Sequence, residues 1–222
     1  MNGESHPSGN PSHPLQPRRL PSVVPALLAM LAIGGIYLLV STSLSPGPPG
    51  LILVVVSLLL IPLIVTRWRG LLHLTRMLSF LILGVVTLAE IISVVFLLTQ
   101  LLAGRTRAPA LLGDAALIWV ANILTFALWY WEIDGGGPGK RHRDGYASSD
   151  LAFPQVALGK ATNPPWFPSF IDYLFLAFNT STAFSPTDTL VLSRRAKILM
   201  MLQAVLSLLV LAVLAARAVN TL

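Results

Sequence analysis

The sequence predicts an all-α membrane protein, a transmembrane helical bundle of about five spans plus one short re-entrant helix. Hydrophobic residues make up 55% of the 222 residues and charged residues only 11%, whereas a soluble domain carries about 25% charged residues. The apolar residues are gathered in long runs, separated by Pro/Gly turns or by basic residues. This composition excludes a disordered chain and argues against a soluble enzyme.

Four of the predicted spans lie in the first 131 residues. Residues 1–21 are polar and contain five prolines, which predicts a disordered tail. The second apolar run has only 15 residues and reaches span length only with residues 50 and 66–68. Because about 20 apolar residues cross the hydrocarbon of a bilayer, residues 22–131 are predicted to form a four-span region, with spans at 22–40, 51–65, 77–102 and 111–131.

The second half of the chain combines a polar loop with a last span. Residues 132–165 are polar, contain the glycine-rich stretch 135–139 and show no periodicity, so we expect a flexible loop. Residues 198–219 are apolar and long enough to form the fifth span. Residues 166–222 therefore join a short apolar segment to a complete span, which is typical of a pore-like module.

Residues 166–178 (WFPSFIDYLFLAF) form an apolar segment that is too short to cross a bilayer. Pro168 suits a first helical turn, and Asp172 suits the positive end of the helix dipole. Four polar residues follow directly, and we call them the tetrad: Asn179, Thr180, Ser181 and Thr182. Irregular polar backbone is tolerated at membrane depth only where it is buried in protein or lines water. The segment is therefore either a re-entrant pore loop or an amphipathic helix on the interface, with the tetrad as its cap.

The stretch FIDYLFLAFNTSTAFSPTDT, followed by basic residues and a long apolar helix, resembles the pore helix, filter and inner helix of two-span potassium channels. The resemblance covers about 50 of the 222 residues. It implies a homo-oligomer, a tetramer if channel-like, whose pore is lined by residues 179–182 and Asp188. A potassium filter reads T-V-G-Y-G-D, whereas residues 182–188 read TAFSPTD and contain no glycine. Because stacked carbonyl rings need that backbone, we expect weak or non-potassium cation selectivity, with monovalent cations as the conducted ions.

A second resemblance extends over the whole chain. WYWEIDGGGP before the loop and DYLFLAFNTSTAFSPTDT after it resemble an uncharacterised family of small bacterial integral membrane proteins. This resemblance implies a multi-pass protein of the bacterial inner membrane and assigns no activity.

Polar residues inside the predicted spans are candidate functional residues. Glu90 lies at the middle of its span, where a lone carboxylate costs roughly 3 kcal/mol. It could bind a cation, relay a proton, or be a protonated packing residue, and Asn122 at matching depth in the next span is its expected partner. Gln203 and Ser207 are four residues apart and share a helix face. They either line a pore or make hydrogen bonds between helices.

Several classes of chemistry have no support in the sequence. The chain has no cysteine, which excludes disulfides, thiolate nucleophiles and Cys-based zinc sites. The four histidines are dispersed, and no catalytic or nucleotide-binding motif is present. We therefore expect neither an enzyme nor a cofactor or metal. The net charge is +6, but the basic residues are scattered between apolar runs, so the expected partner is the lipid bilayer and not a nucleic acid.

Orientation and function both remain open at this level. With the N-terminus inside, twelve basic residues lie on the inner side and three on the outer side, but without the long loop the ratio is five to three. Three functions follow from the sequence. The first is a homo-oligomeric ion-conducting pore, the second a proton- or cation-coupled transporter that uses Glu90, and the third a non-catalytic membrane scaffold.

Overall fold

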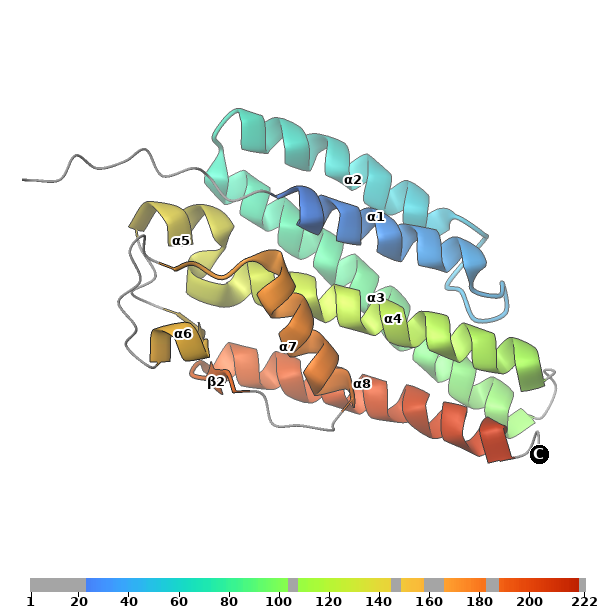
Figure 1. Ribbon diagram of the computed structural model, residues 1–222. Coiled ribbons are helices and arrows are strands. Elements are labelled where there is room, and N and C mark those ends of the chain that lie inside the picture. Colours follow the sequence, from blue (N-terminus) through green and yellow to red (C-terminus); the bar gives the residue numbers. More distant parts are fainter. Residues whose placement is uncertain (1–22, 104–107, 145–148, 158–165, 183–187, 220–222) are drawn as a thin grey trace, which may run out of the picture.

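The structure is a computed structural model that describes residues 23–103, 108–144, 149–157, 166–182 and 188–219. Five helices of these residues lie lengthwise beside one another (Figure 1). They are α1 (Val24–Leu39), α2 (Leu51–Trp68), α3 (Leu72–Ala103), α4 (Ala108–Ile133) and α8 (Arg194–Val219). The predicted all-α membrane bundle is confirmed.

Four of these helices are long and apolar enough to cross a membrane, namely α2, α3, α8 and α4 with its short extension. α2 reaches 18 residues because the helix continues through residues 66–68. Within that last turn, the Thr66 hydroxyl donates to the carbonyls of Pro62 and Leu63, so its polar group is satisfied inside the helix. α1 is shorter, at 16 residues, or about 24 Å. The chain is therefore a multi-pass integral membrane protein.

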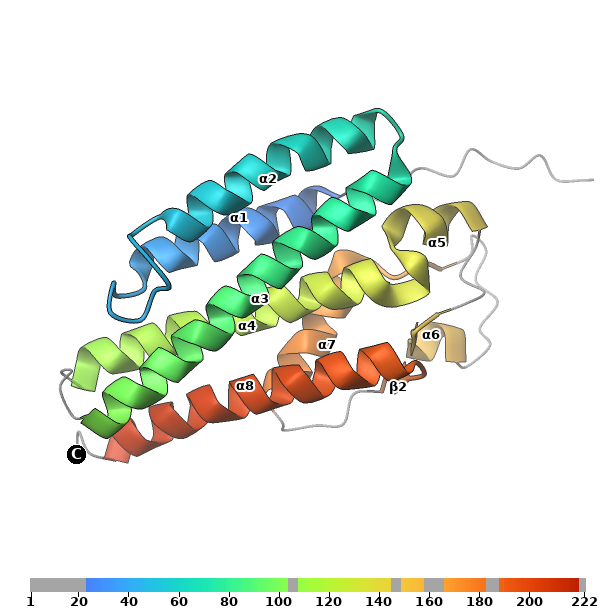
Figure 2. The ribbon, with the colours of Figure 1, turned by 180° about the vertical axis from the view of Figure 1, so that it is seen from behind.

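α4 is the central helix of the bundle. It packs against α1, α3, α8 and the short helix α7 (Phe170–Thr182), whereas α2 packs on α1 and α3 at the outside. Figure 2 shows α3 crossing in front of α4 on the face opposite α7. Side chains on α4 therefore have neighbours on several sides, and four of its polar residues are buried: Asp114, Asn122, Thr125 and Glu132.

The short elements that precede and follow α7, between α4 and α8, lie at one end of the bundle (Figure 1). The sequence predicted a flexible loop over 132–165, but the described part of this region contains four short elements: η1 (Asp134–Gly136), α5 (Pro138–Asp144), β1 (Leu151–Ala152) and α6 (Pro154–Ala157). β1 pairs in antiparallel fashion with β2 (Leu190–Val191), and Leu151 lies opposite Val191. We call η1, α5, β1, α6 and β2 together the end cap.

A glycine turn allows the chain to leave α4 and enter the end cap. Gly135, Gly136 and Gly137 have φ values of 57°, 82° and 96°, a conformation that residues with a Cβ rarely adopt. The glycines are thus needed for one defined turn and do not indicate a flexible loop.

α7 enters the bundle obliquely from the end cap and ends against α8 (Figure 1). After α7 the chain returns to the end cap, because β2 pairs with β1 there. α7 begins and ends four residues later than the predicted segment 166–178. The backbone N–H of Ser169 donates to the Asp172 carboxylate at 2.7 Å. This is one of the two hydrogen bonds of a capping box, with Ser169 as the N-cap residue. Pro168 therefore precedes the helix instead of opening it, and the tetrad forms its last turn.

Candidate functional site

A chain of buried polar side chains crosses the middle of the bundle. Glu90 of α3 is completely buried, and the Asn122 Nδ2 of α4 donates to its Oε1 at 2.6 Å. The predicted pair of Glu90 and Asn122 is therefore present, and both side chains are shielded from lipid. A carboxylate that accepts a hydrogen bond from a neighbouring helix fixes the register of the two helices at this depth.

The series of hydrogen bonds continues from Asn122 across α7 to α8. The Ser181 hydroxyl donates to the Asn122 Oδ1 at 3.0 Å, and the Gln203 Nε2 donates to the Ser181 Oγ at 2.8 Å. The Tyr130 hydroxyl in turn donates to the Gln203 Oε1. All donors from Tyr130 to Asn122 thus point in one direction, toward Glu90. We call these five residues the buried network.

Gln203 and Ser207 bind α7 to α8. The Gln203 Nε2 also donates to the Ala177 carbonyl at 2.8 Å, and the Ser207 hydroxyl donates to the Ser181 carbonyl at 2.7 Å. Ser207 accepts from the Trp119 indole N–H at 3.1 Å. The sequence left two roles open for Gln203 and Ser207, lining a pore or making hydrogen bonds between helices. In the structure both residues make hydrogen bonds between helices.

The second carboxylate oxygen of Glu90 takes no part in this series of hydrogen bonds. The Glu90 Oε2 is buried and has no hydrogen-bond partner among the described residues. The hydroxyl of Tyr37 on α1 is also buried, and it interacts electrostatically with Glu90 and with Ser93. An unpartnered buried polar atom is costly, and a proton on Oε2 would convert this acceptor into a donor.

Only one member of the tetrad belongs to the buried network. Ser181 is buried and faces α4 and α8. The Thr180 and Thr182 hydroxyls donate to carbonyls of their own helix, those of Leu176 and Asn179. Asn179 is half-buried. Asp188 is exposed just before β2 and lies apart from the buried network, so the structure does not bring it together with Ser181.

A second polar cluster holds the end cap against the bundle. The Asp134 carboxylate accepts from the backbone N–H groups of Asp150 and Leu151 and from the Tyr173 hydroxyl at 2.6 Å. Arg141 is buried, and its guanidinium lies 4.9 Å and 5.1 Å from the ring centres of Trp131 and Tyr173. These contacts tie the start of α7 to the end of α4.

An ion pair connects the end cap to the first turn of α8. The Arg195 Nε and Nη2 donate to the two Asp150 oxygens at 2.7 Å and 2.6 Å. Burial alone would raise the pKa of the Asp150 carboxyl, but hydrogen bonds from Arg195 and Ser193 outweigh burial and hold that pKa below its usual range. The arrangement is structural, because it closes the loop that contains α7.

Sequence reasoning missed Tyr130, Asp134 and Arg141. Tyr130 lies near the end of the predicted span 111–131, and its side chain is completely buried. The signal that could have revealed it is the helical spacing from Asn122 through Phe126 to Tyr130, which places all three on one face. Asp134 and Arg141 had no such signal, because they follow the span in a non-periodic segment.

Neither a family model, nor a curated protein, nor a solved structure matches this chain. Among the described residues, no group of three His, Asp or Glu side chains is arranged to hold a metal ion. The buried network is therefore the feature of this chain that bears on its function.

Proposed function

We propose that this protein is a proton- or cation-coupled membrane transporter that uses Glu90 as its binding group. The observation that carries the proposal is the Glu90 carboxylate itself, which is fully buried in the bundle, with one oxygen bound by Asn122 and the other without a partner among the described residues. An ionisable residue at this depth is costly and functional by default.

The burial of Glu90 favours a proton as the bound species, because protonation removes a charge that is costly to bury. The series of hydrogen bonds that starts at Tyr130 ends on the Glu90 Oε1 and leaves Oε2 outside it. Asn122 and Gln203 are amides and cannot pass a proton along this chain. A proton therefore reaches and leaves Glu90 through Oε2, and the Tyr37 hydroxyl, which interacts electrostatically with Glu90, is the candidate group to exchange it.

The test is proton flux into liposomes that contain the purified protein, measured with an internal pH-sensitive dye under an imposed membrane potential. We expect Glu90→Gln to abolish the flux, because the amide keeps the shape but does not titrate. Glu90→Asp should retain part of it. Asp114→Asn is the matched control, since Asp114 is also a buried acid but accepts from the Ser41 N–H at 2.9 Å, outside the buried network. Equal flux in Glu90→Gln and the parent would contradict the proposal.

An ion-conducting pore is the second candidate, and the course of α7 favours it. α7 enters from the end cap, carries the tetrad into the bundle, and the chain returns to the same end. If the tetrad lines a pore, its oxygens replace part of the hydration shell of an ion.

The two candidates respond differently to substitutions. For a pore, the double variant Thr180→Ala/Thr182→Ala should change conductance or ion selectivity, whereas Glu90→Gln should have little effect. For a transporter, the opposite is expected, because the Thr180 and Thr182 hydroxyls donate to carbonyls of their own helix. A parent protein that passes no ion at any voltage or pH would exclude both and favour a membrane scaffold.

A further inference from the structure

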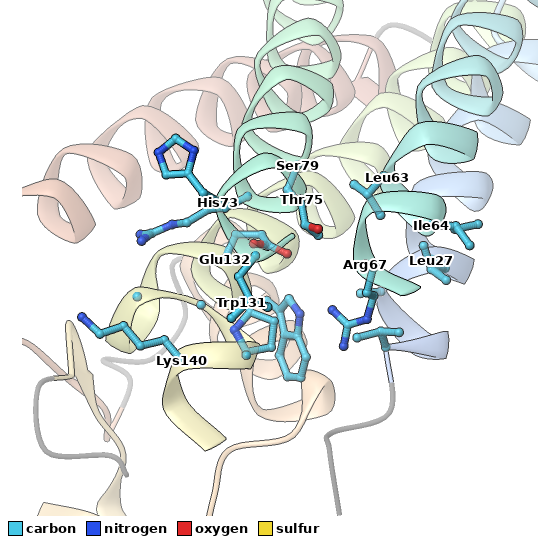
Figure 3. A pocket seen from close by; sticks show the side chains of 18 of the residues that line it. Leu27, Leu63, Ile64, Arg67, His73, Thr75, Ser79, Trp131, Glu132 and Lys140 are labelled. Carbon is cyan, nitrogen blue, oxygen red and sulfur yellow. The ribbon is translucent and has the colours of Figure 1, made fainter. Parts of the chain in front are cut away.

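We infer that a cavity beside the end cap binds the phosphate group of an anionic membrane lipid. The cavity has a volume of about 280 Å³, enough for roughly nine water molecules. It lies between the first turns of α1 and α3, the last turns of α2 and α4, and the glycine turn before α5 (Figure 3). It is separate from the buried network and does not depend on the function proposed for Glu90.

The charges around the cavity favour an anion. Three basic side chains from three different helices line it, namely Arg67, Arg76 and Lys140, against one carboxylate, that of Glu132. Figure 3 shows Arg67 and Lys140 on opposite sides, with Glu132 between them and on the side of Thr75 and Ser79. The Arg76 Nε is buried and has no hydrogen-bond partner among the described residues. A phosphate in the cavity would supply acceptors for the accessible guanidinium and ammonium N–H groups of Arg67, Arg76 and Lys140.

The apolar part of the cavity points to a lipid as the source of the phosphate. Its walls include Leu27 and Met30 of α1 and Leu63 and Ile64 of α2. Trp68 lies at the cavity with 85% of its surface exposed, a position typical of residues at the membrane–water interface. A soluble phosphate compound would gain nothing from these walls, whereas a lipid places its acyl chains beside them.

The cavity also lies at the end of the bundle where anionic lipids are expected. The basic residues of this end include Arg67, Arg69, Arg76, Lys140, Arg141, Arg194, Arg195 and Lys197, whereas the described part of the opposite end carries Arg217 alone. By the positive-inside rule, the end with the excess of Lys and Arg faces the cytoplasm. The cytoplasmic leaflet is the one rich in anionic lipids, and basic pockets between helices bind their head groups.

The experiment measures thermal unfolding of the full-length protein in an uncharged detergent while phosphatidylglycerol or phosphatidylcholine with the same acyl chains is added. We expect phosphatidylglycerol to stabilise the protein at lower concentrations. Arg67→Gln/Arg76→Gln should weaken its apparent affinity about 30-fold, from roughly fivefold for each basic residue removed. Arg69→Gln is the control for each single substitution, because it removes one positive charge at the same end of the bundle but Arg69 is exposed and does not line the cavity. Its affinity should stay within about twofold of the parent.

Glu132→Gln gives a change of opposite sign. It removes the only carboxylate among the lining residues, so phosphatidylglycerol should bind more tightly. Weaker binding in Glu132→Gln would mean that the carboxylate holds a cation and would overturn the inference.

Three other results would also overturn it: equal affinity for the two lipids, an Arg69→Gln effect as large as that of the double variant, or equally tight binding of soluble glycerol phosphate. If the double variant does not fold, Lys140→Gln alone provides the test, with an expected loss of about fivefold.

Discussion

Ser181 is the residue on which the buried network depends. Its hydroxyl donates to Asn122 and accepts from Gln203, so it joins the half of the network that contains Glu90 to the half that contains Tyr130. The neighbouring Thr180 and Thr182 also carry hydroxyl groups, but these donate to carbonyls of their own helix. Membership of the network is therefore decided by helix face and not by residue type.

We expect Ser181→Ala to lower the free energy of unfolding by about 1–3 kcal/mol, because two buried amide groups each lose a partner. Thr182→Ala should change it by less than about 0.5 kcal/mol, since that hydroxyl donates to a carbonyl that is already within the helix. Thermal unfolding of both variants in the same detergent measures the difference. Equal losses would contradict the assignment of Ser181 as the connecting residue.

Individual residues differ in how well the sequence predicted them. Glu90 and Asn122 could be paired because both lie at the same depth in consecutive antiparallel spans, where depth follows directly from residue number. Ser181 could not be separated from its neighbours, because the sequence placed the tetrad after the helix and gave it no face. The helix continues through Thr182, and the hydroxyls of Thr180, Ser181 and Thr182 each find a partner either in the helix or on α4.

At the scale of elements, α7 connects the end cap to the middle of the bundle. Its first turn is bound to the end cap through Tyr173 and Asp134, and its last turn reaches Asn122 and Gln203 within the bundle. The sequence predicted a short helix that does not cross the bilayer from its length alone. The length of the segment could not predict that α7 packs against α4 and α8. This packing depends on which faces of α4 and α8 are turned inward.

The course of α7 predicts that the residues on both sides of it are accessible from the same face of the membrane. Single cysteines can test this, because the native chain has none. We expect Ala157→Cys and Asp188→Cys, both exposed, to react with an impermeant thiol reagent added to one side. Leu102→Cys, exposed at the far end of α3, should react only from the other side. Labelling of positions 157 and 188 from opposite sides would contradict the re-entrant course.

The ion pair of Asp150 and Arg195 makes the end cap sensitive to acid. Because the pKa of Asp150 is lowered in the folded protein, its contribution to stability is present above the unfolded pKa of about 3.9 and is lost as the pH falls through the folded value. Asp150→Asn should lower the free energy of unfolding by about 1–3 kcal/mol at neutral pH. The difference between parent and variant should shrink toward acidic pH, as measured by thermal unfolding between neutral pH and about pH 3. A difference that stays constant over this range would exclude the ion pair as its cause.

The end cap itself could not be predicted from the sequence. Asp134, Arg141 and Asp150 lie in a polar, glycine-rich segment, where charged residues are normally solvated. Their partners are Tyr173 on α7 and Arg195 on α8, which are distant in sequence and come together only when the bundle is complete. Local sequence patterns carry no information on such distant contacts. The polar, glycine-rich composition therefore predicted a flexible loop.

For the molecule as a whole, the decisive feature is that one chain contains the complete buried network. The network comes from four helices of the same chain and is joined by hydrogen bonds between Glu90, Asn122, Ser181, Gln203 and Tyr130. A pore of the kind that the C-terminal resemblance implies would need several copies around an axis, with the tetrad facing that axis. Here Ser181 faces inward to α4 and α8, which favours a function that a single copy can perform.

The number of copies needed for activity can therefore be measured directly. Protein is reconstituted at densities around and below about one copy per liposome, and the fraction of liposomes that show proton flux is counted as the density rises. If one copy is sufficient, this fraction should rise linearly with density at the low end, because each liposome needs a single insertion event. A tetrameric pore would instead give a rise close to the fourth power, since four copies must meet in one liposome. Glu90→Gln at the same densities corrects for leak. We expect the linear dependence, because the buried network closes within one chain, and a fourth-power dependence in the parent would instead favour the tetrameric pore.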